Sequence, residues 1–136
     1  MSTAICPNLF VYGTLRRGSP HPLARTLEDQ ASFIGNGRMQ GRLYGMDRYP
    51  GMIASSDPRD WVIGDLYRLH DPGTILAILD EYEGCGATGT PPYEFERVLA
   101  AALADSGTPV ECWVYLYRGR VTEEARILGG DFLAGR

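Results

Sequence analysis

Glycine and proline are spread along the whole chain, and their spacing limits the length of any regular element. The 136 residues include 17 glycines and nine prolines, which separate short apolar runs. Both residue types are common in turns and unfavourable inside helices and strands. This pattern predicts many short strands joined by turns, with few helices, in a chain whose length suits one compact domain.

Five segments are expected to be strands because they are rich in β-branched and aromatic residues or alternate between apolar and polar residues. They are residues 8–12, 39–46, 61–69, 95–104 and 110–117. The alanines of 95–104 also suit a helix, but Asp105-Ser106-Gly107-Thr108 is a strong turn signal that favours a β-hairpin with the next strand. Helices are expected over 19–30 and, briefly, from Thr122.

The clearest helix is expected over 72–83. Asp71 suits its N-cap, Pro72 its first position and Gly84 its C-terminal stop. An apolar stripe at helical spacing predicts the buried face. Its members are Ile75, Ile78, Leu79 and Tyr82. The glycines and prolines that follow predict an irregular loop.

Composition and charge exclude several classes of protein. Hydrophobic residues make up 44% and charged residues 22%, as in an ordinary globular protein. No apolar run approaches the roughly 20 residues of a membrane span, and the N-terminus lacks the pattern of an export signal, so a cytoplasmic location is expected. The formal net charge is −4, without a basic cluster, which argues against nucleic-acid binding.

The numbers of lysines and cysteines exclude further kinds of catalysis and binding site. The chain has no lysine, which excludes Schiff-base catalysis and a phosphate-binding loop of the Walker type. Its three cysteines, Cys6, Cys85 and Cys112, are widely spaced and form no C-x-x-C pair. They therefore predict neither a zinc site nor a redox pair, and free thiols are expected.

The loop after the predicted helix contains two candidate motifs. Residues 84–89 match G-x-G-x-x-G, but a dinucleotide site needs a preceding strand and a following helix, and here a helix precedes and Thr-Pro-Pro follows. Cys85 would be a nucleophile only with a base such as His21 or His70. The acidic residues nearby in sequence would raise the pKa of its thiol, so an inert thiol is favoured.

Asp80, Glu81 and Glu83 form an acidic group at the end of the same helix. It is either a solvated helix end or the location of a general base. Burial of Glu83, with Asp80 as a like-charged neighbour, would raise the pKa of Glu83 as a base requires. An oxygen-ligand metal site would usually be accompanied by a loop of alternating Asp and Asn, which is absent from this segment of the sequence, so no metal ligand is assigned.

The turn after the first predicted strand has the sequence Tyr12-Gly13-Thr14-Leu15. One interpretation is an ordinary strand end. The other is that N–H groups after Gly13 form a small anion-binding site. The residues alone leave both interpretations open.

Several motifs together resemble the gamma-glutamylcyclotransferase-like family, which includes the gamma-glutamylamine cyclotransferases and bacterial relatives. Residues 9–18 look like its F-V-Y-G-T-L-[KR]-x-G opening, and residues 79–84 look like its L-D-x-x-E-G motif. The strand at 113–117 and the ending Gly129-Gly130-Asp131-Phe132 are similar to later family motifs. The resemblance extends from residue 9 to residue 132.

The resemblance implies an α+β fold, a small and mostly antiparallel β-barrel with a few flanking helices, as a single domain over 1–136. It also implies a cavity at the barrel end for a gamma-glutamyl group. Glu83 matches the family's catalytic carboxylate, Tyr12, Gly13, Thr14 and Leu15 match its substrate-carboxylate loop, and Tyr115 matches a pocket-lining tyrosine. Many members have Y-x-R where this chain has Phe95-Glu96-Arg97, so Tyr93 is an alternative to Phe95 there.

The family reaction implied for this chain is intramolecular. The α-amine of the substrate attacks its own γ-carbonyl, which forms 5-oxoproline and releases an amine, with Glu83 as general acid and base. The expected partner is a small gamma-glutamyl molecule, with no cofactor, nucleic acid or membrane. The alternatives are a non-catalytic binding module with the same pocket and an amidase that uses Cys85. The sequence indicates neither the leaving amine (a peptide, a lysine side chain or an aminoglycoside-like amine) nor the oligomeric state.

Overall fold

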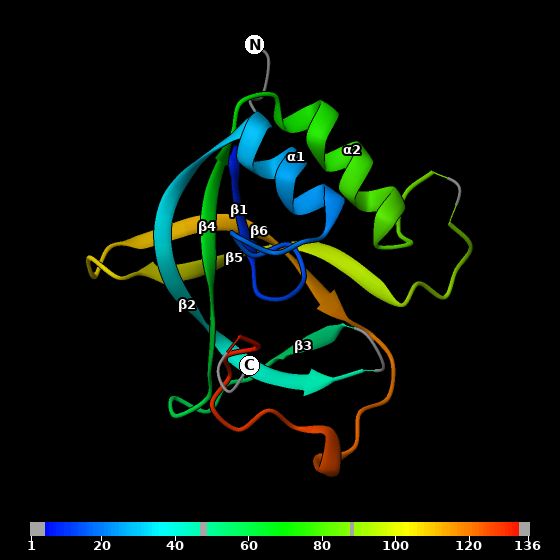
Figure 1. Ribbon diagram of the computed structural model, residues 1–136. Helices are drawn as coiled ribbons and strands as arrows, with labels where there is room; N and C mark the ends of the chain where they lie inside the picture. Colours follow the sequence, from blue (N-terminus) through cyan, green and yellow to red (C-terminus); the bar gives the residue numbers. More distant parts are fainter. Residues whose placement is uncertain (1–4, 47–48, 88, 134–136) are drawn as a thin grey trace.

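The structure is a computed structural model that describes residues 5–46, 49–87 and 89–133. Its strands wrap around a common core, and the two α-helices lie at one end (Figure 1). In chain order the elements are β1 (Asn8–Val11), α1 (Pro22–Gln30), β2 (Ala31–Gly45), β3 (Pro50–Ala54), β4 (Trp61–Leu69), α2 (Pro72–Tyr82), β5 (Phe95–Ala104), β6 (Pro109–Tyr117) and the 3₁₀ turn η1 (Glu123–Ala125).

Five strands form a closed barrel, as the resemblance implies. The order is β2-β4-β1-β6-β5, and pairing of β2 with β5 at Gly37 and Ala104 closes the ring. All pairings are antiparallel except that of β1 with β6, which meet in parallel at Leu9 and Trp113. The first strand therefore lies between two strands that come much later in the chain. The sixth strand, β3, extends the sheet beyond β2.

Two strands differ from the sequence-based expectation. The predicted strand 39–46 is the end of the 15-residue β2, which begins directly after α1. The register shift between Phe33 and Gly35 accommodates residues that resemble a turn in the sequence. The strand β3 was not predicted because it begins with Pro50 and Gly51, residues typical of turns. Proline is nevertheless tolerated at the first position of an edge strand.

Both α-helices begin at the capping residues that the sequence provides. His21 accepts the Leu23 N–H at 3.1 Å through Nδ1, so α1 begins at Pro22 rather than at residue 19. Asp71 caps α2 as predicted and accepts the Thr74 N–H at 3.4 Å. The expected terminal helix is only the 3₁₀ turn η1.

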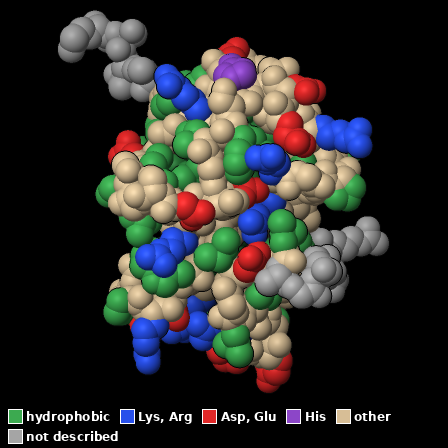
Figure 2. Space-filling view, turned by 60° about the vertical axis from the view of Figure 1, so that its left-hand side comes forward, with side chains coloured by type: hydrophobic (Ala, Val, Ile, Leu, Met, Phe, Trp, Pro, Cys, Tyr) green, Lys and Arg blue, Asp and Glu red, His purple; other side chains and the backbone are tan. Residues whose placement is uncertain are grey.

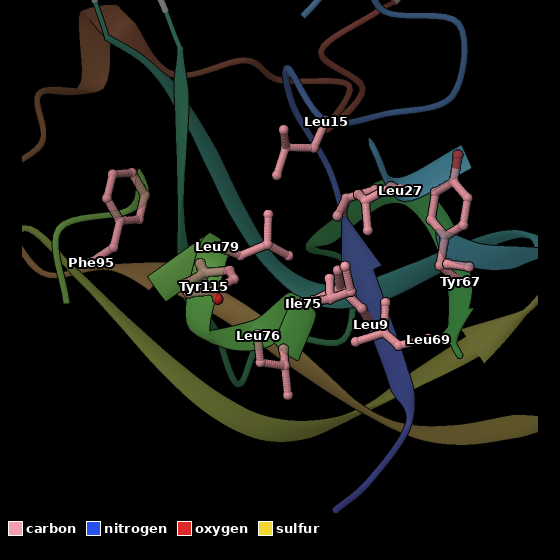
Figure 3. Packing of buried hydrophobic residues seen from close by; sticks show 12 residues of the cluster. Leu9, Leu15, Leu27, Tyr67, Leu69, Ile75, Leu76, Leu79, Phe95 and Tyr115 are labelled. Atoms are coloured by element: carbon pink, nitrogen blue, oxygen red, sulfur yellow. The ribbon is translucent and has the colours of Figure 1, made fainter. Parts of the chain in front are cut away.

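The predicted buried face of α2 is partly wrong. Ile75, Leu76 and Leu79 are buried, whereas Ile78 and Tyr82 are 42% and 43% exposed. The helix lies obliquely over the barrel end, so its contact surface is rotated from the stripe that residue spacing alone predicts. The buried side chains join a core cluster that includes Leu15, Leu27 and Tyr115 (Figure 3).

The outer surface presents both signs of charge. Figure 2 shows arginines interspersed with acidic side chains over one face of the molecule. Within the described ranges, no helix is long and apolar enough to cross a lipid bilayer.

Arg16 belongs to a buried polar cluster beside the turn that follows β1. Its guanidinium contacts Asp131 at 2.7 Å and Asp65 at 3.5 Å. Asp65 also accepts hydrogen bonds from the Arg17 N–H at 2.8 Å and the Asn36 side chain at 2.7 Å. Asp65 thus connects the turn after β1 to both β2 and β4, and Asp131 connects the same turn to the C-terminal segment.

Replacing Asp65 with alanine tests this cluster. Asp65→Ala leaves the buried Arg16 without one of its two counter-charges and removes the acceptor of two part-buried N–H donors, so we expect the free energy of unfolding to fall by about 2–4 kcal/mol. Urea denaturation measures the loss. The matched control is Glu96→Ala at the exposed ion pair with Arg118, where the expected change is under ~1 kcal/mol. Similar losses in the two variants would contradict a stabilising role for the buried cluster.

Candidate active site

A cavity of about 220 Å³ lies between the end of α2, the turn after β1 and the beginnings of β3 and β5. It is smaller than the ~300–1,000 Å³ typical of drug-sized ligands and therefore suits a small molecule. Most of its wall is apolar or aromatic. The described lining residues are Phe10, Val11, Tyr12, Gly13, Thr14, Leu15, Tyr49, Pro50, Tyr82, Glu83, Glu94, Phe95 and Tyr115. The structure therefore brings all six of the predicted site residues to one cavity.

Glu83 lies where α2 ends, and local structure fixes its position. Its N–H donates to the Leu79 carbonyl oxygen at 2.8 Å, and the next residue, Gly84, has φ +83°, a conformation that ends helices and favours glycine. Its side chain lines a largely apolar cavity. Burial, with a smaller contribution from the negative charge of Glu94, raises the pKa of the Glu83 carboxyl to about 7.

Asp80 does not act as the like-charged neighbour that the sequence suggests. Its carboxylate accepts two hydrogen bonds from Arg97, at 2.8 and 3.1 Å, and one from the Tyr115 hydroxyl at 2.6 Å. The Arg97 guanidinium also lies over the Trp113 ring, 4.2 Å from its centre. Asp80 is therefore a neutralised anchor that joins the last turn of α2 to β5 and β6. The negative charge that acts on Glu83 is that of Glu94 instead.

The two tyrosines among the predicted site residues line the cavity, but their hydroxyls are engaged within the protein. Tyr12 donates to the Tyr115 carbonyl oxygen at 2.6 Å and accepts the Met52 N–H at 3.2 Å. Tyr115 donates to Asp80, and burial raises the pKa of both phenols. Their rings, rather than their hydroxyls, are thus available to a ligand, and substrate binding by Tyr12 and Tyr115 stays a prediction.

The turn formed by Gly13, Thr14 and Leu15 presents backbone donors. The Arg16 N–H donates to the Gly13 carbonyl oxygen at 3.1 Å, which closes the turn. Within the described part of the chain, the N–H groups of the three preceding residues have no hydrogen-bond acceptor. Unpaired N–H groups that converge in a turn can bind an anion.

Gly13 is required for close packing rather than for an unusual backbone conformation. Its φ is not positive, but an added Cβ would lie 2.6 Å from Cγ of Pro50. A larger residue at this position would therefore collide with the first residue of β3. Pro50 belongs to β3, the strand that was not predicted, so this contact could not be anticipated from the sequence.

Cys85 does not have the surroundings of an activated nucleophile. Burial, followed by the Asp80 charge, raises the pKa of its thiol. His21 caps α1 and lies edge-on to Tyr82, and His70 is hydrogen bonded to Ser32 at 2.9 Å. Neither histidine is hydrogen bonded to this thiol. The G-x-G-x-x-G loop follows α2 and is itself followed by β5, so it also lacks the strand and helix of a dinucleotide site.

The structure favours Phe95 over Tyr93 as the aromatic residue of the cavity. Phe95 is 5% exposed and packs against the rings of Tyr49 and Tyr117, whereas Tyr93 is 36% exposed and does not line the cavity. Glu94 and Tyr49 also line the cavity but were not among the predicted site residues. Glu94 adjoins the Phe95-Glu96-Arg97 motif, which was the available signal for it. In the described ranges, no group of three or more His, Cys, Asp or Glu side chains could hold a metal ion.

The raised pKa of Glu83 has a consequence for stability. Between the ordinary pKa of 4.5 and about 7, the native carboxyl retains a proton that the unfolded chain has lost, so raising the pH destabilises the native state. The glutamine side chain of Glu83→Gln is neutral at every pH, so this variant does not lose stability in this way as the pH rises. We expect its stability relative to the original protein to increase by about 2–3 kcal/mol between pH 4 and pH 8, measured by urea denaturation. Parallel pH profiles for the two proteins would contradict a buried, proton-binding Glu83.

The contact between Gly13 and Pro50 predicts a rescue. Gly13→Ala forces its Cβ against the proline ring, so we expect a loss of about 1–3 kcal/mol in stability. Pro50→Ala removes the atoms that clash, so the double variant should recover most of the stability. Thermal denaturation of both single variants and the double variant measures the coupling. A double variant whose losses are the sum of the single losses would rule out this contact as the cause.

Comparison with known proteins agrees with the fold and the motifs. The model of the family described as "Gamma-glutamyl cyclotransferase, AIG2-like" matches residues 9–134. The gamma-glutamylaminecyclotransferase A of Danio rerio is 31% identical over 124 residues, covering 82% of this chain and 70% of the relative. The gamma-glutamylaminecyclotransferase of Homo sapiens is 30% identical over 128 residues, with 79% and 76% covered.

A solved structure shows the same fold. The crystal structure of an AIG2-like protein from Mus musculus superposes with a TM-score of 0.72 and 23% identity, covering 96% of this chain and 90% of the other. The family match extends over nearly all of the described barrel and includes the turn after β1 and the end of α2. The chain therefore belongs to the gamma-glutamyl cyclotransferase, AIG2-like family of enzymes.

Proposed function

We propose that the protein is a gamma-glutamyl cyclotransferase that converts a gamma-glutamyl amine to 5-oxoproline and a free amine, with Glu83 as general acid and base. The observation that supports it most is the Glu83 carboxyl, whose pKa is raised to about 7 in an apolar cavity. The same cavity is lined by residues 13–15, whose N–H groups have no acceptor among the described residues. The gamma-glutamylaminecyclotransferase relatives support the same reaction class.

The first step is binding. The N–H groups of Gly13, Thr14 and Leu15 hold the substrate α-carboxylate, and the rings of Tyr12 and Tyr115 pack against its aliphatic portion. The α-ammonium then lies within reach of Glu83. Because amine and carbonyl belong to one molecule, folding the substrate brings them into a near-attack arrangement and supplies much of the rate acceleration.

Proton transfer follows. Glu83 takes one proton from the α-ammonium, and the freed nitrogen lone pair attacks the γ-carbonyl carbon to form the ring. The carbon–nitrogen bond to the leaving amine breaks as Glu83 gives this proton to that nitrogen. The ring nitrogen loses a second proton, which also passes through Glu83 to the leaving group, so the amine departs as an ammonium ion. An ordinary glutamate is about 4 pKa units more acidic than an α-amine, whereas a pKa of about 7 leaves a gap of roughly one unit, or ~1.4 kcal/mol.

The alternative of a non-catalytic binding module uses the same cavity and the same turn. A binder of an anionic ligand gains nothing from a carboxylate in an apolar pocket, so Glu83 favours the enzyme. The amidase alternative is weakened by the raised pKa of the Cys85 thiol, which lowers the fraction of nucleophilic thiolate.

Replacing Glu83 with glutamine tests the proposed function. The amide preserves the shape of the side chain but cannot accept the ammonium proton, so we expect 5-oxoproline formation from gamma-glutamyl amines to be lost while 5-oxoproline still binds. Product chromatography and calorimetry measure the two effects. More than a few per cent of the original rate would exclude Glu83 as the base.

The matched control is Cys85→Ala, for which nearly the full rate is expected. A large loss, or release of free glutamate instead of 5-oxoproline, would support the amidase alternative.

A further inference from the structure

The proposed function needs two groups from distant parts of the chain to lie at a fixed separation. The turn at residues 13–15 follows β1, whereas Glu83 follows the last residue of α2. The pairing of β1 with β4 ends at Val11, before the turn begins. The Arg16 cluster attaches the turn to β2, β4 and the C-terminal segment, and none of these carries Glu83. Other contacts must therefore determine how the turn lies relative to the base.

Tyr12, which lies between β1 and this turn, is attached to two further strands through its hydroxyl. The residue is only 7% exposed. Its hydroxyl donates to the Tyr115 carbonyl oxygen of β6 at 2.6 Å and accepts the Met52 N–H of β3 at 3.2 Å. Two partners on different strands fix the direction of the hydroxyl and with it the position of the ring. The next residue, Gly13, lies directly against Pro50 of the same strand β3, so the turn begins at a point held from two sides.

Tyr115 continues this connection to the helix that precedes Glu83. Its hydroxyl donates to the Asp80 carboxylate at 2.6 Å, and its side chain is buried. Asp80 lies in the last turn of α2, three residues before Glu83. A continuous series of hydrogen bonds therefore leads from the start of the turn, through Tyr12 and Tyr115, to the helix end at Glu83. We call Tyr12 and Tyr115 the tyrosine bridge.

We infer that the two members of the tyrosine bridge are positioning residues, whose hydroxyl groups set the separation between the anion-binding turn and the Glu83 carboxyl. The inference rests on the proposed function and adds a role to two residues that the family resemblance implies only as substrate contacts. The rings face the cavity, whereas the hydroxyls act through other residues of the protein. Ring closure within one bound molecule is sensitive to this separation, because the reacting groups must be held to within a fraction of an ångström.

Tyr67 provides a matched control in the same core. It belongs to the same buried cluster as Tyr115 (Figure 3) and is fully buried. Within the described ranges, its hydroxyl is buried without a hydrogen-bond partner and its side chain does not line the cavity. Tyr67→Phe therefore removes a buried hydroxyl of the same kind without breaking a connection.

The test compares Tyr12→Phe, Tyr115→Phe and the double variant with Tyr67→Phe. The probe substrate is the γ-monoamide of glutamate with butylamine. The measured quantities are kcat and KM, well below the melting temperature of every variant, and the calorimetric dissociation constant of 5-oxoproline. Each variant retains the aromatic ring, so the lining of the cavity is preserved while the hydroxyl is lost.

In each single variant of the bridge we expect kcat to fall about tenfold. KM and the dissociation constant of 5-oxoproline should change less than ~threefold, because the Arg16 N–H still closes the turn on the Gly13 carbonyl oxygen. The double variant should be no slower than the slower single variant, because either break releases the same separation. Tyr67→Phe should retain nearly the full kcat.

Four results would each overturn the inference. Losses that multiply in the double variant would show that the two hydroxyls act independently. A change in KM or in 5-oxoproline binding, with kcat preserved, would show that the hydroxyls contact the ligand. A lower melting temperature without a change in kcat, or an equal loss of kcat in Tyr67→Phe, would leave only a general contribution to the stability of the core.

Failure of the proposed function would appear separately, as an absence of 5-oxoproline from the probe. Carbon-13 NMR titration of the Glu83 carboxyl, with and without 5-oxoproline, then tests the bridge without turnover. The bound carboxylate repels the ionised Glu83 and should raise its pKa by an amount that depends on their separation. A rise that differs between the original protein and the bridge variants, but not in Tyr67→Phe, would support the inference. Equal rises would overturn it, and absence of 5-oxoproline binding would refute both the carboxylate-binding turn and the bridge.

Discussion

The geometry of the site depends on the carboxylate of Asp80. The apolar contact of α2 with the barrel is limited to a few side chains at its buried face, and contacts of this kind do not by themselves fix how a helix end is oriented. The orientation of this helix end is fixed by the two hydrogen bonds from Arg97 and the one from Tyr115, because planar bidentate contacts are directional. Three residues later the helix ends and Glu83 turns into the cavity. An ion pair outside the proposed chemistry thus determines where the proposed base lies.

The sequence predicted those parts of the fold that depend on neighbours along the chain. The limits of β4 and β5 and the cap at Asp71 agree with the structure because strand composition and capping are local properties. The strand β3 escaped detection because Pro50 and Gly51 are tolerated only through tertiary contacts, in which the ring of Tyr117 occupies the space above Gly51. The buried face of α2 was misjudged for a related reason. Residue spacing gives an apolar stripe, but the tilt of the helix on the barrel selects which part of it is covered.

The candidate site shows the same division. The motif positions were sufficient to predict that Glu83, Tyr115 and the turn at 13–15 share one cavity. The burial of Glu83 could be anticipated from its place beside an apolar helix face. The charges around Glu83 could not be anticipated from the sequence. Asp80 is nearer to Glu83 in sequence, yet Arg97 neutralises it, while Glu94 arrives from another element and supplies the repulsion. Electrostatic coupling depends on three-dimensional distance and on counter-charges, and sequence separation reports neither.

The parallel contact of β1 with β6 has a consequence for how the chain acquires its site. A contact between segments this far apart requires closure of a very long loop, which is among the slowest events in the folding of small domains. The turn that holds the proposed carboxylate donors directly follows β1, and its Arg16 is secured by Asp131 from the opposite end of the described chain. A folding intermediate with β2, β3 and β4 already paired therefore still lacks the cavity. Ligand-binding competence should be the last property to emerge during refolding, after most of the β-sheet signal has returned.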